Sequence, residues 1–347
     1  MSATPPAATA DLIGHDEAEA RLVRALASGR LPPAWLICGP DGVGKATLAY
    51  RLARVLLGGR ARPGTLEVGA EDRVFHQVTA GSHPDLTVLE RARDPKSGRL
   101  KADIPVDAVR EAADALHVSS MGSGWRVVLI DPGEAMNRNA ANALLKLLEE
   151  PPPRSALLIV SHRTGRLPPT IRSRCAVLRL RRLPVATVAA ELQARHPEVE
   201  QATLLGVAEL AGGSLGRALR FLESGRQEIY GRVLRALVQD RPDRAGLQTL
   251  AGDLAMLGGS EGFDQVQVLL QTIARRTVHA GLGREVVPIF AGEVALLGRL
   301  AAGGPLDRQA ALWDKTAHLI QAADGLNLDG GHVVHRLLLD FCPATAA

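Results

Sequence analysis

The chain has 347 residues, 46% hydrophobic and 22% charged, which is typical of a soluble globular protein with two or three domains. Its net charge of +4, without a long Lys or Arg run, permits contact with nucleic acid but does not require it. Three widely separated cysteines and no signal peptide or long apolar run argue against a disulfide framework, secretion or a membrane span, and a cytoplasmic protein is expected.

Apolar strands alternate with amphipathic helices in the first half of the chain. Strands are expected at 33–38, 84–90, 125–131, 155–161 and 175–180, and helices at 45–57, 105–118 and 137–150. The stretches 58–73 and 91–103 are expected to be loops. Five apolar strands with intervening helices predict an α/β fold, in which helices cover both faces of a five-stranded parallel sheet.

After about residue 182, only helices are predicted. They are expected at 185–195, 201–211, 216–223, 228–238, 264–278, 289–300, 310–323 and 332–341. Gly-, Ser- and Pro-rich breaks at 212–216, 241–246, 257–263 and 302–305 separate them. We therefore predict an α/β domain over 1–182, a small helical domain over 183–225 and an all-helical domain over 226–347.

The stretch "CGPDGVGKATLAYRLA" (38–53) has the form of a phosphate-binding loop with one substitution. The anion-binding pattern is carried by Gly39, Gly42, Gly44 and Lys45. The next position should carry a hydroxyl that binds Mg²⁺, but it holds Ala46, and a hydroxyl follows only at Thr47. A Gly-rich turn that merely connects a strand to a helix is the alternative interpretation.

Two other stretches are candidates for nucleotide chemistry. Asp131 ends a predicted strand and is expected beside the loop, where it would hold the Mg²⁺ shell, although a polar strand end is the alternative. Pro132 follows it, and Glu134 is too distant along an extended chain to be a good substitute base. In "TIRSRC" (170–175), Arg174 could reach the γ-phosphate of a neighbouring subunit or be a plain surface charge.

The other chemically active side chains are interpreted as structural. His76, His83 and His162 have no partners at metal-ligand spacing and are expected in turns or at strand edges. Cys175 is expected to be a small buried residue. No metal site is predicted.

Four stretches together carry a family resemblance. They are "LPPAWLICGPDGVGKATLAYRLARVLL", "AGSHPDLTVLE", "NAANALLKLLEEPP" and "PPTIRSRC". From about residue 11 onward, the chain resembles the delta prime subunit of the bacterial DNA polymerase III clamp loader, which belongs to the AAA+ proteins. The Ser-Arg-Cys triplet after the helix that ends in "LLEEPP" is the most specific part of the resemblance.

The resemblance implies an AAA+ domain, a helical lid and a helical collar. It also implies a hetero-oligomer with gamma/tau and delta subunits, which uses ATP to open the sliding clamp (beta) and place it on primed DNA. The chain would then be a component of the DNA polymerase III holoenzyme, the replicative DNA-directed DNA polymerase. Within it, Arg174, flanked by Ser173 and Cys175, would complete the ATP site of an adjacent subunit.

Three positions depart from the motor subunits of that family. Ala46 lacks the metal-binding hydroxyl, Pro132 stands where a Glu polarises water, and Gly216 replaces the lid arginine of "GSLR". We therefore expect no hydrolysis in cis and no required cofactor, with residual ADP or ATP binding left open. The alternatives are an active gamma/tau-like ATPase subunit and a small-molecule P-loop kinase. The zinc-binding cysteines of many relatives are missing from 58–80, so no zinc is expected.

Overall fold

The computed structural model describes residues 4–93, 100–101, 103–117, 124–223, 226–239, 243–256, 262–326 and 328–342. The chain divides into two compact units. The first combines Met1–Thr187 with Gly213–Arg217, and the second combines Val188–Gly212 with Ala218–Ala347. The three-domain division at 182 and 225 stays a prediction.

A five-stranded sheet forms the centre of the first unit. Its strands are β1 (Ala34–Cys38), β2 (Leu86–Leu89), β3 (Arg126–Ile130), β4 (Ser155–Ser161) and β5 (Ala176–Arg179). Their order is β2-β3-β4-β1-β5, and every pairing is parallel. All residues of β1 and β4 are buried, as expected where both faces of a parallel sheet are covered. The predicted α/β fold with a five-stranded parallel sheet is confirmed.

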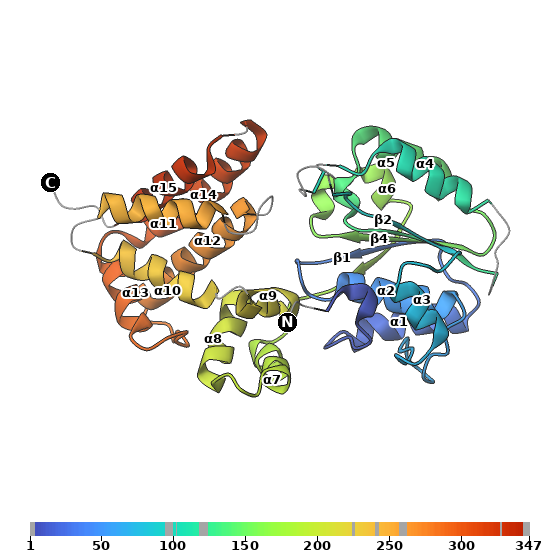
Figure 1. The fold of residues 1–347 in the computed structure, drawn as a ribbon, viewed down its shortest axis with the longest axis horizontal. Coiled ribbons are helices and arrows are strands. Elements are labelled where there is room, and N and C mark those ends of the chain that lie inside the picture. The colour runs from blue at the N-terminus through green and yellow to red at the C-terminus, as the bar shows by residue number, and fades with distance from the viewer. Residues whose placement is uncertain are drawn as a thin grey trace. The chain divides into compact units, whose positions relative to one another are not determined.

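Helices cover both faces of this sheet (Figure 1). One face is covered by α1 (Asp16–Ala27), α2 (Lys45–Leu56) and α3 (Arg73–Thr79), and the other by α4 (Val106–Ala115), α5 (Arg138–Glu149) and α6 (Pro169–Arg172). Because side chains alternate along a strand, β1 contributes Trp35 and Ile37 to the first core and Leu36 to the second. The described residues also form three short 3-10 helices: η1 (Pro6–Ala8), η2 (Gly133–Ala135) and η3 (Thr164–Arg166).

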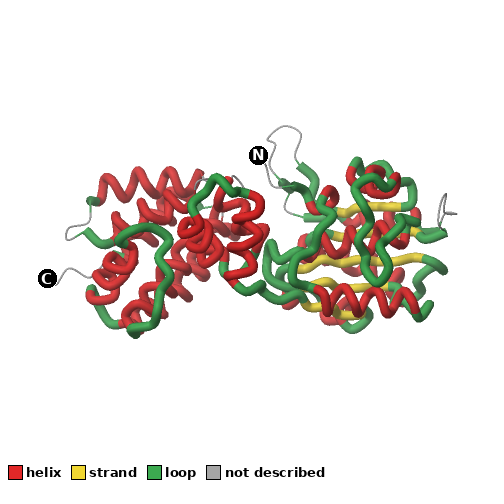
Figure 2. Tube along the Cα trace, turned by 90° about the horizontal axis from the view of Figure 1, so that it is seen from below, coloured by secondary structure: helices red, strands yellow, loops and turns green. Residues whose placement is uncertain are grey.

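Helices are the only regular elements among the described residues of the second unit (Figure 2). It contains α8 (Gln201–Ala211), α10 (Arg226–Leu237), α11 (Arg244–Met256), α12 (Gly262–Gly281), α13 (Glu293–Ala302), α14 (Leu306–Leu326) and α15 (Gly330–Phe341). α12 packs against α13 and α14, and α11 packs against α15. Two further helices, α7 (Val185–Arg195) and α9 (Leu215–Glu223), lie where the chain passes between the units.

Four described helices lie where none was predicted, namely α1, α3, α6 and α11. α3 has seven residues and α6 has four, so neither is long enough for an apolar periodicity to stand out. The Asp72 carboxylate caps α3 by accepting a hydrogen bond from the Val74 backbone N–H at 2.7 Å. His76 therefore lies in a helix, and its expected place in a turn was wrong. Parts of the predicted segments 91–103, 105–118, 241–246 and 257–263 lie outside the described residues.

Candidate functional site

The glycine loop joins β1 to α2, in the strand–turn–helix context that the sequence predicts. Its glycines Gly39, Gly42 and Gly44 have φ angles of 151°, 72° and 106°, which favour residues without a Cβ. A Cβ on Gly39 would lie 2.3 Å from the carbonyl oxygen of Leu180, and one on Gly42 would lie 2.4 Å from Oγ of Ser214. Packing within this chain therefore already requires glycine at both positions.

Lys45, the first residue of α2, is turned into the loop. Only 3% of this residue is exposed, and its Nζ donates a hydrogen bond to the Pro40 carbonyl oxygen at 2.5 Å. Burial lowers the pKa of Lys45 to about 8, although the nearby carboxylates of Asp41, Asp131 and Glu134 oppose this shift. The ammonium group is thus held by a carbonyl of its own loop.

Residues 213–217 pack directly on the glycine loop. The Gly216 N–H donates to the Gly42 carbonyl at 2.8 Å, and the Ser214 hydroxyl donates to the Asp41 carbonyl at the same distance. A Cβ on Gly216 would lie 3.0 Å from the Gly42 carbonyl oxygen. An arginine at 216, as in the motor subunits that the chain resembles, would therefore require the loop to give way.

Acidic side chains follow β3, near Lys45. Burial raises the pKa of Asp131 to about 6, although the positive charge of Lys45 opposes the shift. Nε2 of His162 lies 4.0 Å from Oδ1 of Asp131, which gives this histidine a single acidic neighbour. Glu134 belongs to η2 and not to an extended chain. Its Oε1 accepts hydrogen bonds from the backbone N–H groups of His162 and Arg163, at 2.8 and 3.0 Å.

Glu134 therefore has a structural role, because its carboxylate fixes the turn that follows β4. The last residue of that strand, Ser161, was missed by sequence reasoning. Its hydroxyl is fully buried, and its Oγ has no hydrogen-bond partner among the described residues. The backbone carbonyl of Ser161 accepts from the Gly39 N–H at 3.3 Å, which places this strand end beside the glycine loop.

Arg174 lies on the turn between α6 and β5. Its side chain is 37% exposed, and two contacts within the chain fix the guanidinium group. One terminal nitrogen donates to the Thr170 carbonyl at 3.1 Å, and the other donates to the Glu149 carboxylate at 2.7 Å. The Ser173 hydroxyl also donates to the Thr170 carbonyl, at 3.1 Å. Cys175 was expected to be buried and is partly buried, and burial raises the pKa of its thiol to about 11.

The Arg174 turn and the glycine loop lie at opposite ends of the sheet. β1 and β5 are parallel, with Trp35 opposite Ala176 and Cys38 opposite Arg179. The glycine loop follows the last of these pairs, whereas Arg174 precedes the first. Because the paired stretch alone spans about 10 Å, and each group lies beyond its end, Arg174 cannot reach the loop of its own chain.

Several known proteins are similar to this chain. The profile of the family described as "DNA polymerase III, delta subunit" matches residues 14–184. DNA polymerase III subunit delta' of Pseudomonas aeruginosa is 40% identical over 58% of this chain and 59% of that protein. The Yersinia pestis subunit delta' is 31% identical over 72% of this chain and 71% of that protein. The chain belongs to the delta prime family of DNA polymerase III subunits.

A second delta prime relative and one solved structure are also similar to this chain. The match to the Escherichia coli subunit delta' has 32% identity and covers 64% of each chain. Matches to the Pseudomonas and Escherichia proteins thus span about three fifths of those relatives. Among solved structures, a gamma subunit-related protein of Thermotoga maritima has 18% identity and a TM-score of 0.45, over 93% of this chain and 98% of that one.

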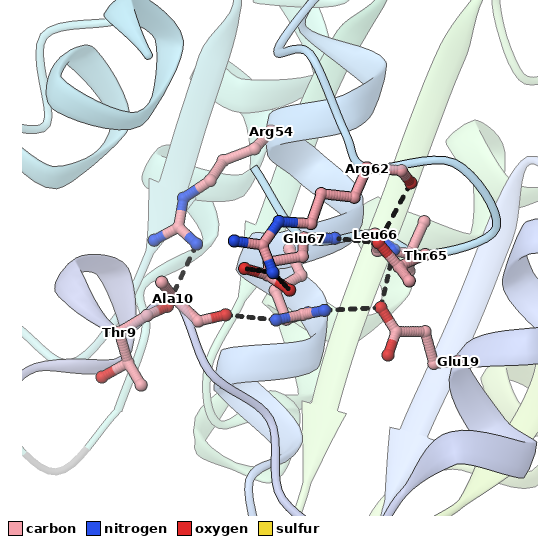
Figure 3. A network of polar contacts seen from close by, with 9 residues as sticks. Thr9, Ala10, Glu19, Arg54, Arg62, Thr65, Leu66 and Glu67 are labelled. Carbon is pink, nitrogen blue, oxygen red and sulfur yellow. Dashed lines mark hydrogen bonds and ion pairs between the residues drawn. The ribbon is translucent and has the colours of Figure 1, made fainter. Parts of the chain in front are cut away.

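The stretch 58–80, which contains no cysteine, is held by charged side chains (Figure 3). Oε1 of Glu19 accepts from the Arg51 guanidinium and from the Leu66 backbone N–H, both at 2.6 Å. Arg51 also donates to the Ala10 carbonyl, and the buried Arg54 donates to the Thr9 carbonyl at 3.1 Å. These contacts tie the stretch to α1, α2 and the N-terminal segment.

Two kinds of feature are absent from the residues that the structure describes. There, no group of three or more His, Cys, Asp or Glu side chains could hold a metal ion. The same part of the chain has no helix with the length and apolar character needed to cross a bilayer. The expected absence of zinc stays a prediction.

Proposed function

We propose that this chain is a non-hydrolysing subunit of a DNA polymerase III clamp loader. In this proposal, it assembles with gamma/tau and delta subunits and supplies Arg174 to the ATP site of a neighbouring subunit. The complex uses that ATP to load the sliding clamp onto primed DNA. A planar guanidinium can bridge two phosphate oxygens and neutralise the charge that develops during phosphoryl transfer.

The position of Arg174 carries this proposal. It lies beyond the amino end of β5, whereas the glycine loop lies beyond the carboxyl end of β1. An arginine that acts on a nucleotide from this place must act on the nucleotide of another chain. Its partial exposure supports such a role, because an incoming phosphate can compete for the guanidinium group.

The composition of the chain's own loop supports the absence of hydrolysis. Ala46 offers no hydroxyl for Mg²⁺, and Pro132 offers no carboxylate next to Asp131. The nearby Glu134 is engaged by two backbone N–H groups. Gly216 has no side chain, and its backbone N–H donates a hydrogen bond to the Gly42 carbonyl of the loop. A water molecule positioned for attack would find none of the groups that usually activate it.

The remaining groups at the loop fit an anion better than they fit a metal-bound nucleotide. Lys45 and the N-terminus of α2 would hold phosphate oxygens, and the orphaned hydroxyl of Ser161 is a further polar group at that edge of the sheet. The Mg²⁺ ligand that normally accompanies ATP is missing at Ala46. We therefore propose that the glycines serve packing and that the subunit needs no nucleotide of its own.

The test is DNA-dependent ATP hydrolysis and clamp loading by a complex reconstituted with the other loader subunits of the same organism. Arg174→Ala should slow loading strongly, and Arg174→Lys should rescue it poorly because an ammonium group lacks the planar fork. The bulk ATPase rate should fall less, because only one of several ATP sites would contact this subunit. Arg172→Ala, which removes an exposed arginine two residues away, is the matched control.

Lys45→Ala separates the proposal from its main alternative, an active gamma/tau-like ATPase. The variant should load clamps at nearly the wild-type rate, provided that it assembles. The isolated wild-type chain should also show no turnover of ATP. Loading abolished by Lys45→Ala but untouched by Arg174→Ala would mean that the subunit acts through its own nucleotide site.

A further inference from the structure

The ion pair between Arg174 and Glu149 has a consequence for when the arginine acts. We propose that Glu149 is a latch, a positioning residue that holds Arg174 within its own subunit and gives it up when a neighbour's phosphate arrives. This inference rests on the proposed function, because it concerns the availability of the same arginine.

The geometry restrains the guanidinium group from two directions. Glu149 is the last residue of α5, and Pro151 prevents the helix from continuing. Its Oε1 accepts from one terminal nitrogen of Arg174 at 2.7 Å. The other terminal nitrogen donates to the carbonyl of Thr170, the second residue of α6, at 3.1 Å. Both terminal nitrogens, which would form a fork toward a phosphate, are thus already engaged.

The charges and the exposure of this pair favour a latch, which a phosphate can displace, over a permanent structural contact. The carboxylate cancels part of the positive field that would attract a phosphate, so Arg174 is a weaker anion ligand while it is paired. The two side chains are 37% and 53% exposed, and exposed ion pairs are weak. A phosphate with more than one negative charge can therefore displace the carboxylate. Pairing with Glu149 is therefore expected to lower the fraction of Arg174 that is free to bind a phosphate by about 1.5- to 5-fold.

The first experiment tests the pair in the isolated chain. A double-mutant cycle with Glu149→Gln and Arg174→Ala is measured by urea-induced unfolding. Coupling of about 1.5- to 5-fold in the unfolding equilibrium constant is expected. The matched control is the same cycle with Glu150→Gln, which removes the next carboxylate in the sequence, also exposed. It should show no coupling. Equal coupling in the two cycles, or none in either, would overturn the latch whatever the subunit does in the complex.

The second experiment measures kcat and kcat/KM for DNA-dependent ATP hydrolysis in the reconstituted complex. The rate with Arg174→Ala is subtracted, which leaves the part that depends on Arg174. That part should rise about 1.5- to 5-fold when Glu149 is changed to Ala. It should rise less for Glu149→Gln, because the amide oxygen still accepts a hydrogen bond. Neither change should alter the rate in an Arg174→Ala background, whereas a merely structural effect would persist there.

The outcomes separate the latch from the proposed function. If Glu149→Ala lowers the Arg174-dependent rate while Glu149→Gln leaves it unchanged, the carboxylate orients the arginine and the latch is wrong. If neither variant changes that rate although the isolated chain shows coupling, the pair exists but does not restrain catalysis, and the latch is again wrong. If Arg174→Ala itself has no effect on hydrolysis or loading, the proposed function fails, and the unfolding cycle still reports whether the pair forms.

Discussion

Replacing Glu19 by Ala should destabilise the first unit more than any other single carboxylate deletion on α1. Glu19 and Arg51 form a pair whose side chains are 12% and 4% exposed. The variant would leave the Arg51 guanidinium without its counter-ion and the Leu66 N–H without an acceptor. Deleting one partner of a buried pair typically costs 3–5 kcal/mol. Because Arg51 keeps its bond to the Ala10 carbonyl, we expect a loss of about 3 kcal/mol.

The assay is urea-induced unfolding followed by tryptophan fluorescence, to which the buried Trp35 of β1 contributes. Glu17→Ala is the matched control, since Glu17 lies in the same first turn of α1 but is exposed. It should cost well under 1 kcal/mol, which reflects only the helix dipole. Equal losses for the two variants, or a loss below about 1 kcal/mol for Glu19→Ala, would show that the charged contacts do not hold the 58–80 stretch.

Three other predictions concern the acidic site, the helical unit and metal content. Burial raises the folded-state pKa of Asp131 to about 6, so the stability that this group contributes is full below about pH 4 and is lost as the pH rises through 6. Asp131→Asn removes the titrating group and should therefore become more stable than wild type as the pH rises from 4 to 7, by at most ~3 kcal/mol. Thermal unfolding of the two proteins over this pH range measures the difference. Glu293→Ala should destabilise the helical unit by about 3–5 kcal/mol in urea unfolding, because it strips the buried Arg276 and Tyr230 of their shared carboxylate, and a loss near zero would contradict this. Elemental analysis of the purified chain should find no stoichiometric zinc, and one dialysis-resistant zinc per chain would prove this wrong.

Local patterns in the sequence predicted most of the fold. The five strands were recognisable because each is a short apolar run, and burial on both faces of a parallel sheet requires such runs. Most of the longer helices were recognisable from their periodicity, and the segments 45–57 and 137–150 agree with α2 and α5 to within a residue, whereas α1 and α11 were not predicted. The short helices α3 and α6 were missed because they span too few turns to show a period.

Some features of the candidate site follow from the sequence alone, and others only from the tertiary structure. The sequence by itself determined the glycine pattern, the absence of a hydroxyl at Ala46 and the Ser-Arg-Cys triplet, because each is a property of neighbouring residues. Only the tertiary structure decided that Arg174 is paired with Glu149, 25 residues away, and that residue 216 packs on the glycine loop. The parallel pairing of β1 with β5 also placed the arginine and the loop at opposite ends of the sheet. These facts depend on which segments meet after the chain folds, and no local pattern of residue types encodes that choice.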